Sequence, residues 1–299
     1  MSAEPTREPL VQLTVNIIVL ASIYALIACG YVLIYRVSRV LNLAHGELMM
    51  LGAYLVLATA SLFSGQPVLA LGMAVLLSLV VGVLVYVFLM RKMTGEMVLA
   101  AILTTVALGI LIRGAVVLIW SASQQYPAQA LSVPNPSIAI GGAYISLWSL
   151  VLVGMNAAIY AALFGFLRFG RWGIRMRAAG QNPLLAAQRG INLHGVYALA
   201  WALSTLTGAL AGILMALDSG LTQSMPVIGL KAFPAALVGG LDSLVGALIG
   251  ALIIAGAEVL LIYYVDPLLS DVVPFLVLIA MLIVRPWGLF GTREELDRV

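Results

Sequence analysis

Long apolar stretches of about 20 residues follow one another through almost the whole of this 299-residue chain. That is the length a helix needs to cross the hydrocarbon core of a bilayer. The stretches lack the period-2 alternation of membrane β-barrel strands, so helices are predicted. The predicted spans are 11–35, 40–63, 67–90, 97–120, 143–167, 196–217, 244–264 and 272–290. Only 9% of the residues are charged, far below a soluble domain, which predicts an all-α polytopic membrane protein with a single transmembrane domain over 1–299.

A further apolar run, 226–241, is shorter than the others and is interrupted by prolines and glycines. Such a run predicts a broken or re-entrant helix, which is tolerated at membrane depth only where it is buried in protein or lines a cavity. If the run crosses the membrane, the chain has nine transmembrane helices. If it folds back, the chain has eight.

The distribution of charge favours nine crossings. If residues 36–39 are cytoplasmic, then 91–96, 168–195, 242–243 and the C-terminus are cytoplasmic too. These segments hold twelve of the fifteen Lys and Arg residues, and the uncharged loop 121–142 falls on the other side. Positively charged loops stay in the cytoplasm. We therefore predict a periplasmic N-terminus and a cytoplasmic C-terminus.

A polar cluster opens the second predicted span, with Asn42, His45 and Glu47 close together. Unsatisfied polar groups in lipid cost several kcal/mol, so such residues normally face protein or a water-filled path. Helical spacing places Asn42, His45, Met49 and Gly52 on one face, with Glu47 pointing elsewhere. Two interpretations remain open: a pathway or gate element, and a helix start whose side chains cap backbone groups.

Small residues recur four apart, in Gly208-x-x-x-Gly212 and Gly246-x-x-x-Gly250. This spacing lets helix backbones approach closely, which is how membrane helices associate. Packing within the chain is favoured over a dimer contact.

The hydrophilic segment 168–195 carries five arginines and predicts a basic cytoplasmic loop. Within it, Asn182 can cap a short helix that has Pro183 at its first position and Gly190 as its stop. The predicted helix therefore spans 183–190, with Ala186, Ala187 and Gly190 forming a small-residue surface. A short amphipathic helix between two spans is suited to docking in a groove of a cytoplasmic partner.

Ionisable residues also occur inside predicted spans, notably Arg113, Glu258 and Lys231. An intramembrane charge is a functional hypothesis by default. Arg113 is expected either to extend its side chain to the interface or to form a buried pair with Glu258.

Other kinds of chemistry find no support in the sequence. The chain has no GxxxxGK[ST] phosphate-binding loop, so ATP hydrolysis would be done by another chain. Its two histidines are far apart and it has one cysteine, so no metal site, cofactor or catalytic constellation is predicted. The net charge of +3 implies no nucleic-acid partner. We predict a protein that is not an enzyme.

Four segments together resemble the permease subunits of bacterial ABC importers for branched-chain amino acids. They are NLAHGELMMLGAY, RAAGQNPLLAAQRGIN, KAFPAALVGGLDSLVGALIGALIIAGAE and RPWGLFG. The resemblance implies an α-helical permease in the bacterial inner (cytoplasmic) membrane. It also implies a second permease subunit, two cytoplasmic ATPase subunits and a periplasmic substrate-binding protein as partners. The coupling helix of such importers maps to Pro183–Gly190, with Leu184 where relatives often carry an acidic residue.

The sequence thus predicts the membrane-spanning translocation subunit of an ATP-driven importer for branched-chain amino acids. Alternatives are an ABC permease for urea, short amides or other amino acids, or an ion-coupled secondary transporter with Arg113 and Glu258 as its coupling charges. The candidate pathway residues are Asn42, His45, Glu47, Gly239 and Gly240. The candidate ATPase-coupling residues are Pro183, Leu184, Ala186, Ala187 and Gly190.

Overall fold

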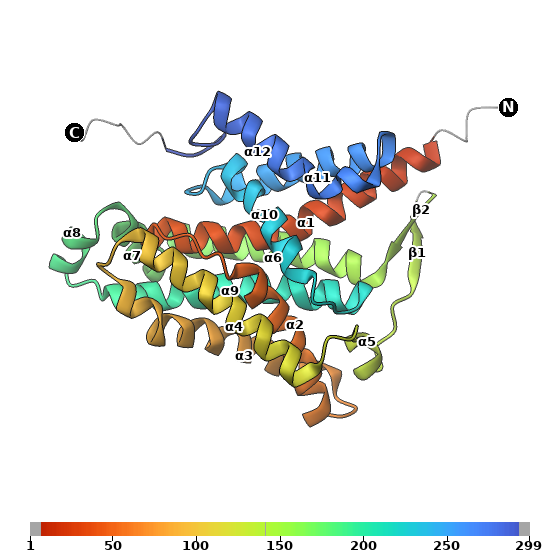
Figure 1. The fold of residues 1–299 in the computed structure, drawn as a ribbon, viewed down its shortest axis with the longest axis horizontal. Helices are drawn as coiled ribbons and strands as arrows, with labels where there is room; N and C mark the ends of the chain where they lie inside the picture. Colours follow the sequence, from red (N-terminus) through yellow and green to blue (C-terminus); the bar gives the residue numbers. More distant parts are fainter. Residues whose placement is uncertain (1–6, 141, 293–299) are drawn as a thin grey trace.

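The computed structural model describes residues 7–140 and 142–292, and most of them form helices that run along a common direction (Figure 1). Within these described residues, seven helices are long and apolar enough to cross a membrane: α1 (Arg7–Ser38), α2 (His45–Leu62), α3 (Pro67–Phe88), α4 (Val98–Trp120), α6 (Leu147–Phe169), α9 (Leu193–Ser219) and α11 (Leu244–Tyr264). Two apolar helices are shorter: α10 (Met225–Gly239) and α12 (Val273–Val284). The predicted all-α polytopic membrane fold is confirmed, and the chain is a multi-pass membrane protein.

Three predicted span boundaries were wrong, and the third, the start at 143, is described with the hairpin below. The second span was expected over 40–63, yet residues 39–44 are not helical and α2 begins only at His45. The last span was expected over 272–290, but α12 ends at Val284. Arg285 precedes Pro286 and takes an extended conformation, because the proline ring disfavours helical geometry in the residue before it.

The short segment around α10 passes from one end of the bundle to the other. Leu221, just before α10, forms a backbone bridge with Gln125, which follows the end of α4. Asp242, just after α10, lies 3.8 Å from Arg39 at the opposite end, where α1 has finished. The segment is therefore a short crossing helix with Pro234 inside it, and the re-entrant alternative is not what the structure shows.

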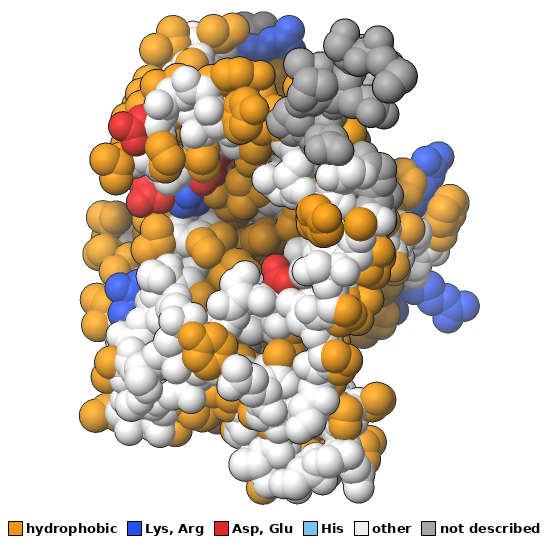
Figure 2. Space-filling view, turned by 90° about the vertical axis from the view of Figure 1, so that its right-hand side faces the viewer, with side chains coloured by type: hydrophobic (Ala, Val, Ile, Leu, Met, Phe, Trp, Pro, Cys, Tyr) orange, Lys and Arg blue, Asp and Glu red, His pale blue; other side chains and the backbone are white. Residues whose placement is uncertain are grey.

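One end of the bundle carries a short hairpin that the sequence did not predict. Its antiparallel strands are β1 (Ser137–Ile140) and β2 (Ala143–Ser146), and the helix α5 (Pro127–Ala130) lies nearby at the right of Figure 1. The expected helix start at 143 is thus displaced to Leu147, because Ser146 caps α6 by accepting a hydrogen bond from the Ser149 backbone N–H at 3.1 Å. Figure 2 looks at this end and shows a hollowed face with few charged side chains.

The opposite end carries α7 (Arg171–Gln181) and α8 (Pro183–Gln188), which extend past the long helices at the left of Figure 1. Two 3-10 turns complete the described elements: η1 (Met90–Met93) before α4 and η2 (Pro267–Asp271) before α12. The two ends therefore differ in chemistry, since α7 carries three arginines whereas β1 and β2 carry no charged residue.

Glycines bring the central helices into backbone contact. Gly212 of α9 packs against the backbone of Met49 in α2, and Gly52 of α2 packs against Ala209. Gly250 of α11 packs in the same way against Gly239 of α10. The four-residue spacing of small residues therefore serves packing within the chain, as predicted.

Candidate functional site

Helix α2 begins inside the bundle, at the depth of the middle of α4. The backbone N–H of Leu43, just before α2, donates a hydrogen bond to Thr105 Oγ1 of α4 at 3.1 Å. Glu47, in the first turn of α2, lies against Gly109 at the centre of α4, where an added Cβ would be 3.1 Å from Glu47 Cδ. Non-helical backbone at such a depth is tolerated only where it is buried in protein or lines a cavity.

Asn42 and His45 are buried and hold this helix start in place. Asn42 Oδ1 accepts a hydrogen bond from the Ala44 backbone N–H at 3.1 Å. His45 Nδ1 lies 3.4 Å from Ser204 Oγ of α9, and the His45 ring centroid is 4.7 Å from that of Tyr31 in α1. The His45 side chain thus faces α1 and α9, whereas that of Asn42 binds the backbone beside it. Glu47 points to α4, away from His45, as the helical spacing predicted.

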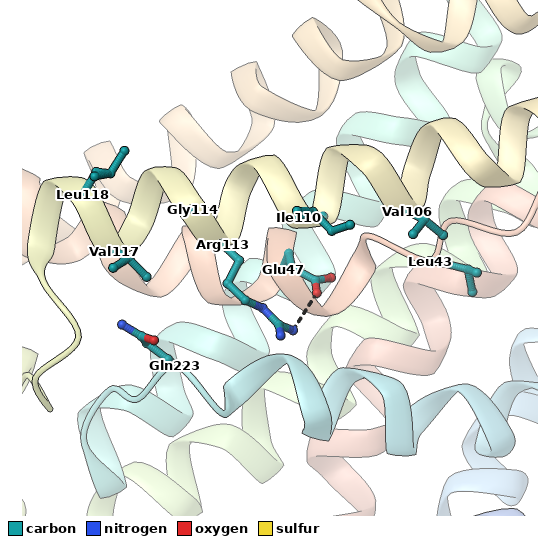
Figure 3. A pocket seen from close by; sticks show the side chains of 10 residues that line it. Leu43, Glu47, Val106, Ile110, Arg113, Gly114, Val117, Leu118 and Gln223 are labelled. Carbon is teal, nitrogen blue, oxygen red and sulfur yellow. Dashed lines mark hydrogen bonds and ion pairs between the residues drawn. The ribbon is translucent and has the colours of Figure 1, made fainter.

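A groove opens on the other side of α2, between it and α4 (Figure 3). It encloses about 670 Å³ and is lined by Leu43, Glu47, Val106, Gly109, Ile110, Arg113, Gly114, Val117, Leu118 and Gln223. Among these lining residues, only Glu47 and Arg113 are charged. Arg113 Nη2 lies 2.9 Å from Glu47 Oε1. The Arg113 side chain is 50% exposed and that of Glu47 is 14% exposed, so the pair forms a charged spot on a largely apolar wall.

Of the two alternatives for Arg113, the buried pair with Glu258 was wrong, because α4 packs against α2 and brings Arg113 beside Glu47. Glu258 instead forms a buried ion pair with Lys231 of α10 and accepts a hydrogen bond from Tyr24 Oη at 2.6 Å. Lys231 Nζ also lies 3.2 Å from Asp271 Oδ1. Sequence spacing carried no signal for either pair, since the partners are 66 and 27 residues apart.

Removing the charge of Lys231 is expected to destabilise the protein. A Lys231→Met variant leaves the Glu258 carboxylate buried without its cation, and breaking a buried ion pair from one side costs about 3–5 kcal/mol. The midpoint of thermal unfolding of the purified protein in detergent should fall. The double variant Lys231→Met/Glu258→Leu should recover most of the loss. A single variant as stable as the native protein would contradict this prediction.

Gly239 and Gly240 lie at the end of the bundle that carries α7 and α8, and they do not line the groove. Gly240 has a φ of 106° and ends α10, where an added Cβ would overlap the backbone of Gly291. Gly239 is in close backbone contact with Gly246 of α11, and Gly240 is in close contact with the segment that follows α12.

The predicted short helix is present as α8, beginning at Pro183 as expected and ending at Gln188, shortly before Gly190. Asn182 caps it by accepting a hydrogen bond from the Leu185 backbone N–H at 3.0 Å. Gly190 has a φ of 79°, which suits a glycine that ends the following turn. Leu184 and Leu185 are 69% and 57% exposed, Ala187 is exposed, and Ala186 is buried. The helix therefore presents two leucines outward at one end of the molecule.

The helices form a membrane-crossing bundle in which α2 begins at mid-depth, beside a groove that contains one ion pair. These features define the class of protein, a polytopic α-helical membrane transport protein. The chain belongs to the family described as "Branched-chain amino acid transport system / permease component", whose profile matches residues 13–282. The resemblance drawn from the sequence motifs is confirmed. Permeases of this family are membrane subunits of ABC importers, so partner subunits are implied.

Individual relatives are similar over nearly the full chain. The high-affinity branched-chain amino acid transport system permease protein LivH of Escherichia coli (strain K12) is 31% identical, with 95% of this chain and 96% of the relative covered. BraD, the corresponding permease protein of Pseudomonas aeruginosa, is 28% identical, with 96% and 97% covered. A probable branched-chain amino acid transport permease protein LivH of Methanocaldococcus jannaschii is 27% identical, with 92% and 90% covered.

Proposed function

We propose that this chain is the membrane-spanning translocation subunit of an ATP-driven importer for branched-chain amino acids. The observation that carries the proposal is the start of α2 at the depth of the middle of α4, beside a groove with one acidic and one basic side chain. Interrupted helices at the centre of the membrane are typical of substrate pathways in transporters. The apolar groove wall suits an aliphatic substrate.

The partners in this proposal are a second permease subunit, two cytoplasmic ATPase subunits and a periplasmic substrate-binding protein. The groove is open on one side, and a second permease would close it. ATP hydrolysis is assigned to separate subunits because the chain has no phosphate-binding loop. The coupling contact is assigned to α8, through Pro183, Leu184, Ala186, Ala187 and Gly190, because this helix presents exposed leucines beyond the end of the bundle.

The proposed location is the bacterial inner membrane, with the N-terminus in the periplasm and the C-terminus in the cytoplasm. Supporting this orientation, Arg36, Arg39 and the arginines of α7 belong to one end of the bundle. Basic segments stay in the cytoplasm. Residues 1–6 and 293–299, which hold the two termini, lie outside the described residues.

Among the candidate pathway residues, we assign Glu47 to the wall of the pathway. Asn42, His45, Gly239 and Gly240 are assigned to the packing that shapes it, because the first two hold the start of α2 and the glycines hold the end of α10.

Uptake is expected to require ATP and the separate ATPase subunits. The chain would be reconstituted in proteoliposomes with its partner permease, the ATPases and the binding protein, and leucine uptake measured with and without ATP. An ATPase with its catalytic residue removed provides the control, and urea provides the substrate control. Leucine uptake by the chain alone, driven by an ion gradient, would overturn the proposal in favour of a secondary transporter. Uptake of urea in place of leucine would overturn the assignment of branched-chain amino acids as the substrates.

A further inference from the structure

We propose that Glu47 and Arg113 together form a binding site for the zwitterionic part of an amino acid, within the groove between α2 and α4. The Arg113 guanidinium binds the substrate α-carboxylate and the Glu47 carboxylate binds the α-ammonium group. This inference rests on the proposed function, and it names the residues and chemical class of ligand at the same site.

The geometry of the pair leaves both groups able to bind a ligand. The structure records one contact between them, from Arg113 Nη2 to Glu47 Oε1 at 2.9 Å. A guanidinium has five N–H donors in a planar fork that matches a carboxylate, so donors remain for a second carboxylate. Half of the Arg113 side chain is exposed, and both charged groups extend into the groove (Figure 3). A zwitterion therefore adds to the pair without breaking it.

The position of the pair argues for a role beyond packing. Both residues lie within membrane-crossing helices, where ionisable side chains are rare and normally face protein or a water-filled cavity. A partly exposed ion pair contributes little to stability. Although Arg113 is paired with Glu47, half of its side chain is exposed, so its charge also needs a ligand, a partner chain or water beside it. The groove has room for a ligand.

The rest of the groove fits the aliphatic part of the same ligand. Its wall beyond the charges is mostly apolar, and Val106, Ile110 and Val117 share one side of it on α4. The volume of about 670 Å³ lies in the range of small-molecule sites, roughly 300–1,000 Å³. The first turn of α2 also lies at the groove, and the N-terminal end of a helix favours a carboxylate nearby.

Protection of an introduced cysteine tests the site directly. Cys29 is buried and is the chain's one cysteine, so Ile110→Cys would provide a single reactive thiol on the groove wall. In the complete importer without nucleotide, leucine should slow labelling of this thiol by a water-soluble maleimide several-fold. Leucinamide, which lacks the carboxylate, and 4-methylpentanoate, which lacks the ammonium group, should not. Adding Arg113→Gln or Glu47→Gln should raise the leucine concentration needed for protection at least tenfold.

Ala122→Cys, at an exposed position outside the groove, is the matched control and should label equally with and without leucine. Suppose that the Ile110→Cys importer takes up leucine with ATP. If its thiol is then labelled at the same rate with and without leucine, or is not labelled at all, the binding site is overturned while the proposed function stands. Equal protection by leucine, leucinamide and 4-methylpentanoate would also overturn it. Loss of ATP-driven uptake in the unsubstituted complex would instead overturn the proposed function.

Discussion

Gly229→Ala should lower the stability of the protein by about 1–3 kcal/mol and displace α2 from α10. Gly229 of α10 lies directly against the backbone of Gly46 in α2, where an added Cβ would overlap the Gly46 Cα. The reverse contact is equally close, since a Cβ on Gly46 would lie 2.6 Å from the carbonyl oxygen of Pro226. Both surfaces are backbone, so no side chain can rotate away and the helices must separate.

Gly72→Ala in α3 is the matched control, because a Cβ there meets nothing within 4 Å. Both substitutions give the same gain in helix propensity, about 1 kcal/mol, so the difference between them isolates the contact of α2 with α10. The midpoint of thermal unfolding in detergent should fall by several degrees for Gly229→Ala and be unchanged or raised for Gly72→Ala. Equal midpoints for the two variants would show that the crossing accommodates a methyl group.

The second large effect is expected at α8, where replacing Leu184 and Leu185 together by alanine should weaken association of the ATPase subunits at least tenfold. Fully burying one leucine is worth roughly 1.5–3 kcal/mol, and about 1.4 kcal/mol corresponds to tenfold in affinity. The two leucines are the large exposed apolar side chains of this helix, and Pro183–Gln188 contains no charged residue. Raising the salt concentration should therefore weaken association much less than the double substitution does.

A bulky side chain on the same surface of α8 should uncouple ATP hydrolysis from transport. Ala187→Trp places a large ring at an exposed position of α8 and should block the partner groove, whereas Ala187→Ser keeps the size and should couple normally. Association is measured by co-purification and coupling by leucine taken up per ATP hydrolysed. A complex that dissociates in moderate salt but tolerates Ala187→Trp would show that the arginines of α7 form the contact instead.

Much of the fold was predictable because the bilayer restricts which residues a membrane-crossing segment can contain. Each long span is a run of apolar residues that a bilayer requires, and the prediction needs no knowledge of neighbouring helices. The start of α8 was predictable for a similar reason, since Asn182 and Pro183 act on the backbone beside them. The facing of Glu47 away from His45 also followed from helical spacing alone.

The partners of the charged groups were not predictable, because they depend on which helices become neighbours. Arg113 was expected either to reach the interface or to pair with Glu258, but it lies beside Glu47, and Glu258 lies beside Lys231. The sequence by itself determined the membrane class, the positions of the long apolar helices and the short capped helix. Only the tertiary structure decided the depth at which α2 begins and the groove beside it. Both arise from contacts between residues far apart in the chain, such as Leu43 with Thr105, for which local pattern carries no information.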